Sequence, residues 1–142
     1  GGDARFDRAL IFTLDYLRGV DAVIFISDFI KVKENVFNSL LLASHKFESV
    51  AIMIRDLLDK TFPDVDREIV IEDPATKEQI LINPRLIKSV YEKNALESEN
   101  MVKSIFRRGE VDLLELTTDK SFAFPLASFL GERVKIARSV GR

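Results

Sequence analysis

The chain has no cysteine, no tryptophan and only one histidine. Without cysteine there can be no disulfide, no thiolate zinc ligand and no thiol nucleophile. The single histidine, His45, has no second histidine or positioned base to act with, so the sequence offers no histidine-based catalytic pair. This composition is compatible with a reducing compartment, and we expect a cytoplasmic protein.

The chain also lacks a dominant charge sign and any long apolar run. Its formal net charge is -2 over 142 residues, so no overall field attracts nucleic acid or an anionic membrane. No apolar run approaches the ~20 residues that span a bilayer. The first residues, Gly-Gly-Asp-Ala-Arg, do not resemble a signal peptide. We expect no nucleic-acid partner, no membrane segment in this chain, and one domain over residues 1–142.

The common catalytic signatures are missing as well. There is no glycine-rich phosphate loop, no nucleophile elbow and no His-Glu-x-x-His zinc motif. The sequence therefore favours a protein that is not an enzyme, although an enzyme remains open.

Three apolar runs predict the sheet. Residues 22–26 (Ala-Val-Ile-Phe-Ile) are mostly β-branched or aromatic, which predicts a strand buried on both faces, as in parallel sheets covered by helices. Residues 49–55 and 111–116 repeat this pattern, and residues 6–17 and 34–46 have helical spacing. The alternation predicts an α/β domain with three layers, Rossmann-like, whose core is three parallel strands with flanking helices.

A hairpin insertion at about residues 63–83 interrupts this alternation of strands and helices. Two short strands, at residues 69–72 and 79–82, surround a turn that contains Pro74. Asn83 and Pro84 then suit the start of a long helix over about residues 84–108. That helix would be ~37 Å long against ~17 Å for a five-residue strand, so it must overhang the sheet or kink. We expect Gly109 to cap it and a last helix to open at Pro125. The hairpin and the long helix depart from a plain βα repeat, which favours them as a contact surface.

Each predicted strand ends in a carboxylate: Asp28, Asp56 and Asp119. Parallel strands bring these residues to one edge, where ligands bind in open α/β sheets. With the nearby hydroxyls of Ser27, Thr117 and Thr118 they form a set of hard oxygen ligands suited to Mg²⁺. The alternative is structural, because aspartate and threonine also favour helix caps and turns.

Arg55 and Asp56 together form a second candidate site, for interaction rather than catalysis. Arg55 adjoins the end of the second strand, where it can pair with a carboxylate across the sheet edge or contact a partner. A solvated arginine is the equally good alternative.

Several segments of the chain, in the same order along the sequence, resemble those of a known protein family. They are residues 23–29 (Val-Ile-Phe-Ile-Ser-Asp-Phe), Arg55-Asp56, residues 63–65 (Pro-Asp-Val), residues 72–74 (Glu-Asp-Pro) with Thr76, and residues 111–119 (Val-Asp-Leu-Leu-Glu-Leu-Thr-Thr-Asp). From about Phe6 to Phe129 the chain resembles the C-terminal part of the MoxR-associated domain-of-unknown-function family (DUF fifty-eight). Members of this bacterial and archaeal family commonly lie beside MoxR-type AAA+ ATPases and carry a von Willebrand factor A-like domain.

The resemblance implies a doubly wound sheet with a metal-ion-dependent adhesion site. Asp28 matches the aspartate that ends the fourth strand of such a domain, and Ser27 and Asp119 are weaker candidates for the same metal site. The Asp-x-Ser-x-Ser strand would precede Gly1, and the expected threonine is missing from residues 2–6. We therefore expect a truncated von Willebrand factor A-type domain in which Mg²⁺ is the one cofactor considered and its site is incomplete.

The truncation predicts an unpaired sheet edge. The absent strand would lie beside residues 23–26, and such an edge recruits other strands. We expect this strand to self-pair, to be covered by a helix or to form a homodimer.

The resemblance implies a non-catalytic interaction module that works with a MoxR-type AAA+ ATPase in the assembly or chaperone-like maturation of other proteins. The alternative is a Mg²⁺-dependent phosphoryl-transfer or hydrolytic domain that uses Asp28, Asp56 and Asp119. A third option is a structural piece of a membrane-tethered parent protein.

Overall fold

The computed structural model describes residues 6–30, 32–62, 69–72 and 76–140. Among the predicted features, residues 2–5, residues 63–65 and residues 73–75 lie outside the described residues. The elements follow in the order α1 (Phe6–Tyr16), β1 (Ala22–Ser27), η1 (Glu34–Val36), α2 (Phe37–Lys46), β2 (Glu48–Arg55), η2 (Leu57–Asp59), β3 (Ile69–Glu72), β4 (Gln79–Ile82), α3 (Pro84–Arg108), β5 (Asp112–Thr117) and α4 (Ala123–Val140).

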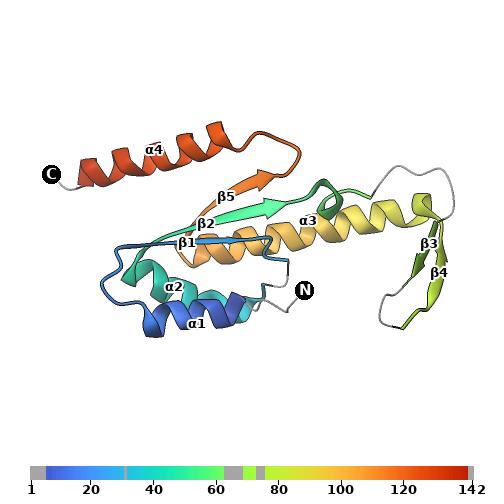
Figure 1. Ribbon diagram of the computed structural model, residues 1–142, viewed down its shortest axis with the longest axis horizontal. Coiled ribbons are helices and arrows are strands. Elements are labelled where there is room, and N and C mark those ends of the chain that lie inside the picture. Colours follow the sequence, from blue (N-terminus) through green and yellow to red (C-terminus); the bar gives the residue numbers. More distant parts are fainter. Residues whose placement is uncertain (1–5, 31, 63–68, 73–75, 141–142) are drawn as a thin grey trace.

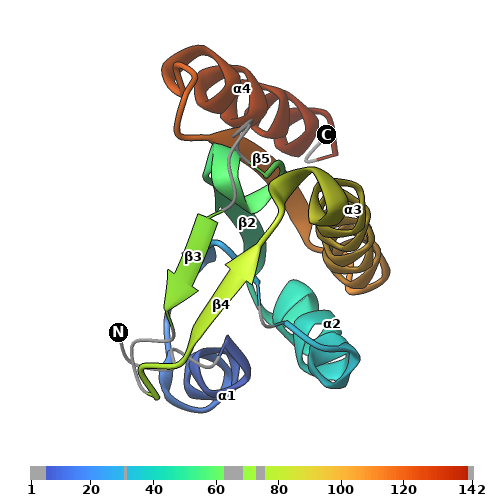
Figure 2. The ribbon, with the colours of Figure 1, turned by 90° about the vertical axis from the view of Figure 1, so that its right-hand side faces the viewer.

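The predicted α/β class is confirmed by a three-stranded parallel sheet in the order β1-β2-β5. Helices α1, α2 and α3 cover one face of this sheet and α4 lies against the other (Figures 1 and 2). Strands β3 and β4 form the predicted antiparallel hairpin as a separate pair, at the far end of α3 (Figure 1).

The core lies between the sheet and the layer of α1, α2 and α3. Its centre is a cluster of phenylalanine rings. Phe29 packs edge-on against Phe6 at 5.1 Å and against Phe106 at 4.8 Å between ring centroids, and Phe6 also contacts Phe25. Phe29 and Phe106 are fully buried. Edge-to-face aromatic pairs of this kind stabilise a core beyond the area that they bury, so the loop after β1 is fixed to α1 and α3.

The prediction that the first strand is buried on both faces is wrong. Phe25 is buried, whereas Ile24 is 52% exposed and Ile26 is 62% exposed on the opposite face. This exposure results from the tertiary packing, because β1 is an outer strand of the sheet and α4 lies over β5 rather than over β1. By contrast β2, the central strand, is buried on both faces as expected, with Val50 to Met53 all inaccessible or nearly so.

Helix α3 begins and ends at the predicted residues and overhangs the sheet (Figure 1). Its C-terminal turns bury Val102, Ile105 and Phe106, while Val90 and Leu96 are each 58% exposed. The helix therefore belongs to the core only over its last part.

Several element boundaries differ from the prediction. The segment 34–46 begins as the 3₁₀ turn η1 before α2, and α4 begins at Ala123, two residues before Pro125. After α3 the residue with a left-handed backbone is Glu110, with φ 56°, rather than the expected cap Gly109. Gly109 is required for another reason, since a Cβ there would lie 2.8 Å from the Cβ of Leu40.

None of the helices in the described part of the chain is both long enough and apolar enough to cross a membrane.

Candidate functional site

The three core strands end side by side, as predicted from their parallel order. Ser27 of β1 pairs in register with Met53 of β2, and Arg55 of β2 pairs with Thr117 of β5. Asp28 and Asp56 directly follow their strands, so both lie at the same edge of the sheet. Asp119 lies two residues beyond β5 and is exposed.

Ser27 and Asp28 stabilise the turn after β1. The Phe29 N–H donates to Ser27 Oγ at 3.2 Å, and the Ile30 N–H donates to Asp28 Oδ1 at 3.2 Å. These bonds accompany a left-handed backbone at Phe29, with φ 52°, which is uncommon for a large side chain. The two residues thus hold the turn that places the Phe29 ring in the core.

Asp56 links the ends of β2 and β5. Its Oδ1 accepts the Leu58 N–H at 3.0 Å and its Oδ2 accepts the Thr118 hydroxyl at 2.9 Å, while the Asp59 carboxylate accepts the Asp56 N–H at 2.8 Å. These contacts form a capping box on η2. The hydrogen bond from Leu58, followed by that from Thr118, lowers the pKa of Asp56. Both carboxylate oxygens are therefore engaged.

A metal at this edge remains a prediction. In the described ranges no three aspartate, glutamate or histidine side chains come together in a way that could hold a metal ion. Asp28 and Asp56 share the edge, but each already accepts a backbone N–H. The contacts of Asp28 and Asp56 therefore match the structural alternative, that of caps and turn formers.

Arg55 is not solvated, so that alternative is wrong, whereas its pairing with a carboxylate and its contact with a partner stay predictions. The residue is 5% exposed, and its Nε is buried without a hydrogen-bond acceptor. Within the described residues its side chain makes no ion pair. Arg55 faces the helix layer together with Ala51 and Met53, which are fully buried, because alternate residues of a strand share a face. That alternation was the signal in the sequence that could have predicted its burial.

An ionic cluster joins η2, α3 and β5, and nothing in the sequence pattern had indicated it. Glu115 of β5 accepts a hydrogen bond from Lys60 and lies 2.6 Å from the Nζ of Lys103, and Lys60 also lies 3.4 Å from Glu99. Burial raises the pKa of Glu115, but the hydrogen bonds from Lys103 and Lys60 outweigh it, so the pKa is lowered overall. The same contacts raise the pKa of Lys60. Glu115 and Lys60 therefore both favour their charged forms, as a structural network requires.

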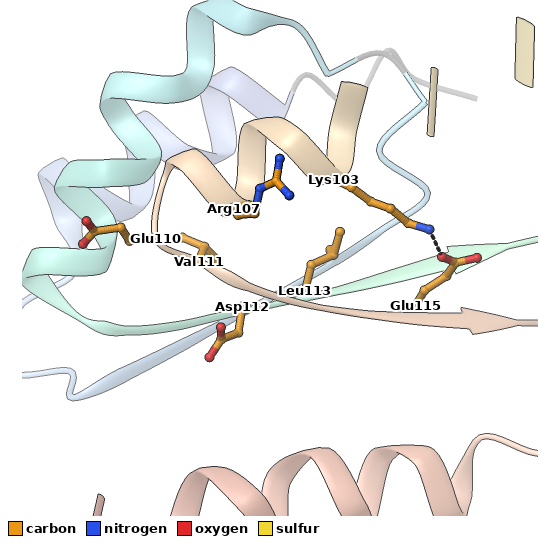
Figure 3. A pocket seen from close by; sticks show the side chains of 7 residues that line it. All are labelled: Lys103, Arg107, Glu110, Val111, Asp112, Leu113 and Glu115. Carbon is orange, nitrogen blue, oxygen red and sulfur yellow. Dashed lines mark ion pairs between the residues drawn. The ribbon is translucent and has the colours of Figure 1, made fainter. Parts of the chain in front are cut away.

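A groove of about 660 Å³ lies between α3 and β5 (Figure 3). Its lining residues are Lys103, Arg107, Glu110, Val111, Asp112, Leu113 and Glu115. Most of the charges are matched within the chain: Lys103 pairs with Glu115, and Asp112 accepts a hydrogen bond from Arg133 of α4. The groove thus presents paired charges over an apolar floor, without a nucleophile and base side by side.

A second groove, of about 590 Å³, lies on the other face of the sheet between β1 and α4. It is lined by Ala22, Ile24, Glu48, Val50, Leu130, Arg133 and Val134. Its surface is mainly apolar and it adjoins the outer edge of β1, so it differs in chemistry from the groove at β5.

The fold and these sites define an α/β domain with a parallel sheet and no recognisable catalytic arrangement among its described residues. No family model matches the chain, and no curated protein or solved structure is significantly similar to it.

Proposed function

We propose that this protein is a non-catalytic interaction module that binds a protein partner through the outer edge of β1. One observation carries the proposal: β1 is an outer strand without the features that normally protect an edge. In the described residues it pairs only with β2, and its six residues (Ala-Val-Ile-Phe-Ile-Ser) include no charge and no proline. Natural edge strands usually carry such features because an open edge pairs readily with another strand.

The apolar surface beside this edge supports the same proposal. Ile24 and Ile26 are both more than half exposed and form an apolar strip along β1, and Ile24 also lines the groove beside α4. Burying an isoleucine completely stabilises a complex by about 1.5–3 kcal/mol, so covering the exposed half of each contributes roughly half of that. A strand added to β1 would gain backbone hydrogen bonds and this apolar contact together.

Helix α4 lies on the same face as this strip but leaves it open, because its polar contacts hold it to β2 and β5. Arg133 donates to Asp112 of β5 and to Glu48 at the start of β2, the latter at 3.1 Å. Neither anchor lies on β1. The apolar strip therefore remains available to a partner.

The resemblance to the MoxR-associated family supports a MoxR-type AAA+ ATPase as the partner, with assembly or maturation of other proteins as the process served. The exposed half of α3 and the β3–β4 hairpin, which the sequence favoured as a contact surface, are an additional surface in this proposal. When no partner is present, we expect the β1 edge to pair with a second copy of the chain.

The test is the binding of a purified MoxR-type ATPase to immobilised wild-type protein, Ile26→Lys and Leu42→Lys. Leu42 is the matched control because it is 61% exposed but lies on α2. We expect the wild type and Leu42→Lys to bind alike and Ile26→Lys to lose binding, since a lysine on an edge strand opposes strand addition. Absence of binding by the wild type, or equal binding by all three proteins, would overturn the proposal.

A further inference from the structure

The groove between β1 and α4 has an apolar floor and an apolar wall. Ala22 and Ile24 of β1 line its floor, and Leu130 and Val134 of α4 line its wall. Ile24 is 52% exposed and Val134 is 51% exposed. Parallel strands carry apolar residues on both faces because helices normally cover both faces of the sheet. On this face α4 is the one helix of the described chain, and it lies over β5 (Figure 2), so the face beside β1 has room for a further element.

The side of α4 that faces the groove is apolar. Ala123 and Ala127 lie on the same side of the helix as Leu130 and Val134, because residues three and four apart share a helix face. These four residues follow one another at intervals of four, three and four, which is the spacing by which two helices pack side by side. A helix that lies beside α4 would therefore meet apolar side chains from α4 and from β1 together.

The space beside α4 matches the width of one helix. Strand β1 lies two strand spacings from β5, which is about 10 Å. Packed helices lie about 8–10 Å apart, so a helix beside α4 would lie directly over β1. A helix also satisfies its own backbone hydrogen bonds, whereas an extended segment on this apolar face would leave its N–H and C=O groups unpaired. The geometry therefore favours a helix as the occupant.

The charges at the end of the groove favour one direction for such a helix. Asp28, Asp56 and Asp119 follow the three strands at the carboxyl edge of the sheet, with Lys120 beside them. Helix α4 begins near the same edge and runs back along the sheet (Figure 1). The N-terminus of a helix carries the positive end of its dipole, and basic residues ahead of it add to this charge. An incoming helix that runs parallel to α4 would place these positive charges at the acidic edge.

We propose that the groove between β1 and α4 binds an amphipathic helix of a protein partner, with basic residues at the N-terminal end of that helix. Its apolar side would lie on Ile24, Leu130 and Val134, in the manner of other helix-in-groove complexes. The inference goes beyond the proposed function, because a strand added to the edge of β1 would not reach the wall formed by α4. The two proposals can fail separately, since one depends on the backbone of β1 and the other on the side of α4.

The test measures the fluorescence anisotropy of a labelled peptide of about 18 residues, a length at which a helix can form in isolation. The peptide has two lysines at its N-terminus, leucines at alternating intervals of three and four, and alanine and glutamine elsewhere. It is titrated with the wild type, Val134→Lys and Ile11→Lys. Ile11 is the matched control because it is 52% exposed but lies on α1, in the other helix layer. We expect the wild type and Ile11→Lys to bind alike, and Val134→Lys to bind at least about tenfold more weakly, since it places a charge against the apolar contact.

Two further peptides test the chemistry of the occupant. A peptide of the same composition with its leucines spread around the helix should not bind saturably, and one with glutamates in place of the lysines should bind more weakly. The proposal is overturned if the wild type does not bind the first peptide, if Val134→Lys binds it equally, or if either of the other peptides binds as tightly. Because this assay offers no strand to β1, binding of the peptide without binding of the MoxR-type ATPase would support the groove and count against the proposed function alone.

Discussion

The hydroxyl of Thr118 donates to the carboxylate of Asp56 at 2.9 Å and so joins the ends of β2 and β5. The same region is held by the Thr118 N–H, which donates to the carbonyl oxygen of Arg55 at 3.0 Å. These two bonds lie in the β2–β5 part of the edge at which a metal was predicted.

The first prediction concerns the pH dependence that Asp56 brings. Its pKa is lowered from 3.8 by the bonds from Leu58 and Thr118, so the folded state favours the charged form. A carboxylate of this kind stabilises the fold above its unfolded pKa, and this stability is lost as the pH falls through the folded value. We expect Asp56→Asn to be less stable than the wild type in urea at neutral pH, and the difference to shrink below pH 3.8.

The control for Asp56 is Asp119→Asn, a change at an exposed residue beyond the next strand. It should leave the urea midpoint unchanged at both pH values. A difference between Asp56→Asn and the wild type that stays constant with pH would show that the carboxylate charge is not what stabilises this edge.

Arg55→Met is expected to stabilise the isolated protein, by about 1–3 kcal/mol in the free energy of unfolding, because it removes a buried charge that has no ion pair among the described residues. The matched variant is Arg133→Met, whose guanidinium bonds Glu48 and Asp112 and is 19% exposed. That variant should lose up to about 1 kcal/mol, as for partly exposed ion pairs. Urea unfolding at neutral pH checks both. A clear loss of stability in Arg55→Met would mean that the guanidinium already has a stabilising partner.

Two glycine substitutions separate close packing from helix propensity. A Cβ at Gly109 would lie 2.8 Å from the Cβ of Leu40, so Gly109→Ala should destabilise the fold by about 1–3 kcal/mol. In α4, a Cβ at Gly131 would have no heavy atom within 4 Å, and Gly131→Ala should stabilise the fold by about 0.5–1 kcal/mol. Thermal unfolding of the two variants should shift in opposite directions, and a shift of the same sign would contradict the packing of α3 against α2.

The metal prediction has its own measurement, calorimetric titration with Mg²⁺. Because Asp28 and Asp56 already accept backbone N–H groups, we expect no saturable binding by this chain. Binding that Asp28→Ala abolishes would instead support a working metal site, although it would not by itself show catalysis.

The sequence predicted the parts of this fold that depend on local pattern. The parallel strands follow from their β-branched runs, and α3 follows from Asn83-Pro84 at its start and from its apolar spacing. The exposure of Ile24 and Ile26 could not be predicted in this way, because it depends on where α4 packs. A run of apolar residues is the same whether or not a helix covers it.

The candidate site could likewise be predicted from the sequence only where it depends on local pattern and strand order. That Asp28 and Asp56 share an edge follows from the parallel order alone. The cluster around Glu115 could not be found, because it depends on the register of β5 against β2 and on the place where α3 crosses them. The burial of Arg55 could be predicted from its alternation with Met53, but its lack of an ion pair within the described ranges needed the structure.

The central claim, that the outer edge of β1 is a docking surface, is tested most directly by the mass of the protein in solution. Light scattering after size-exclusion chromatography is measured over a concentration series for the wild type, Ile26→Lys and the control Leu42→Lys. We expect the wild type and Leu42→Lys to move from monomer towards dimer as the concentration rises, and Ile26→Lys to stay monomeric. A wild type that is monomeric at every concentration, or a dimer that Ile26→Lys leaves intact, would contradict the claim.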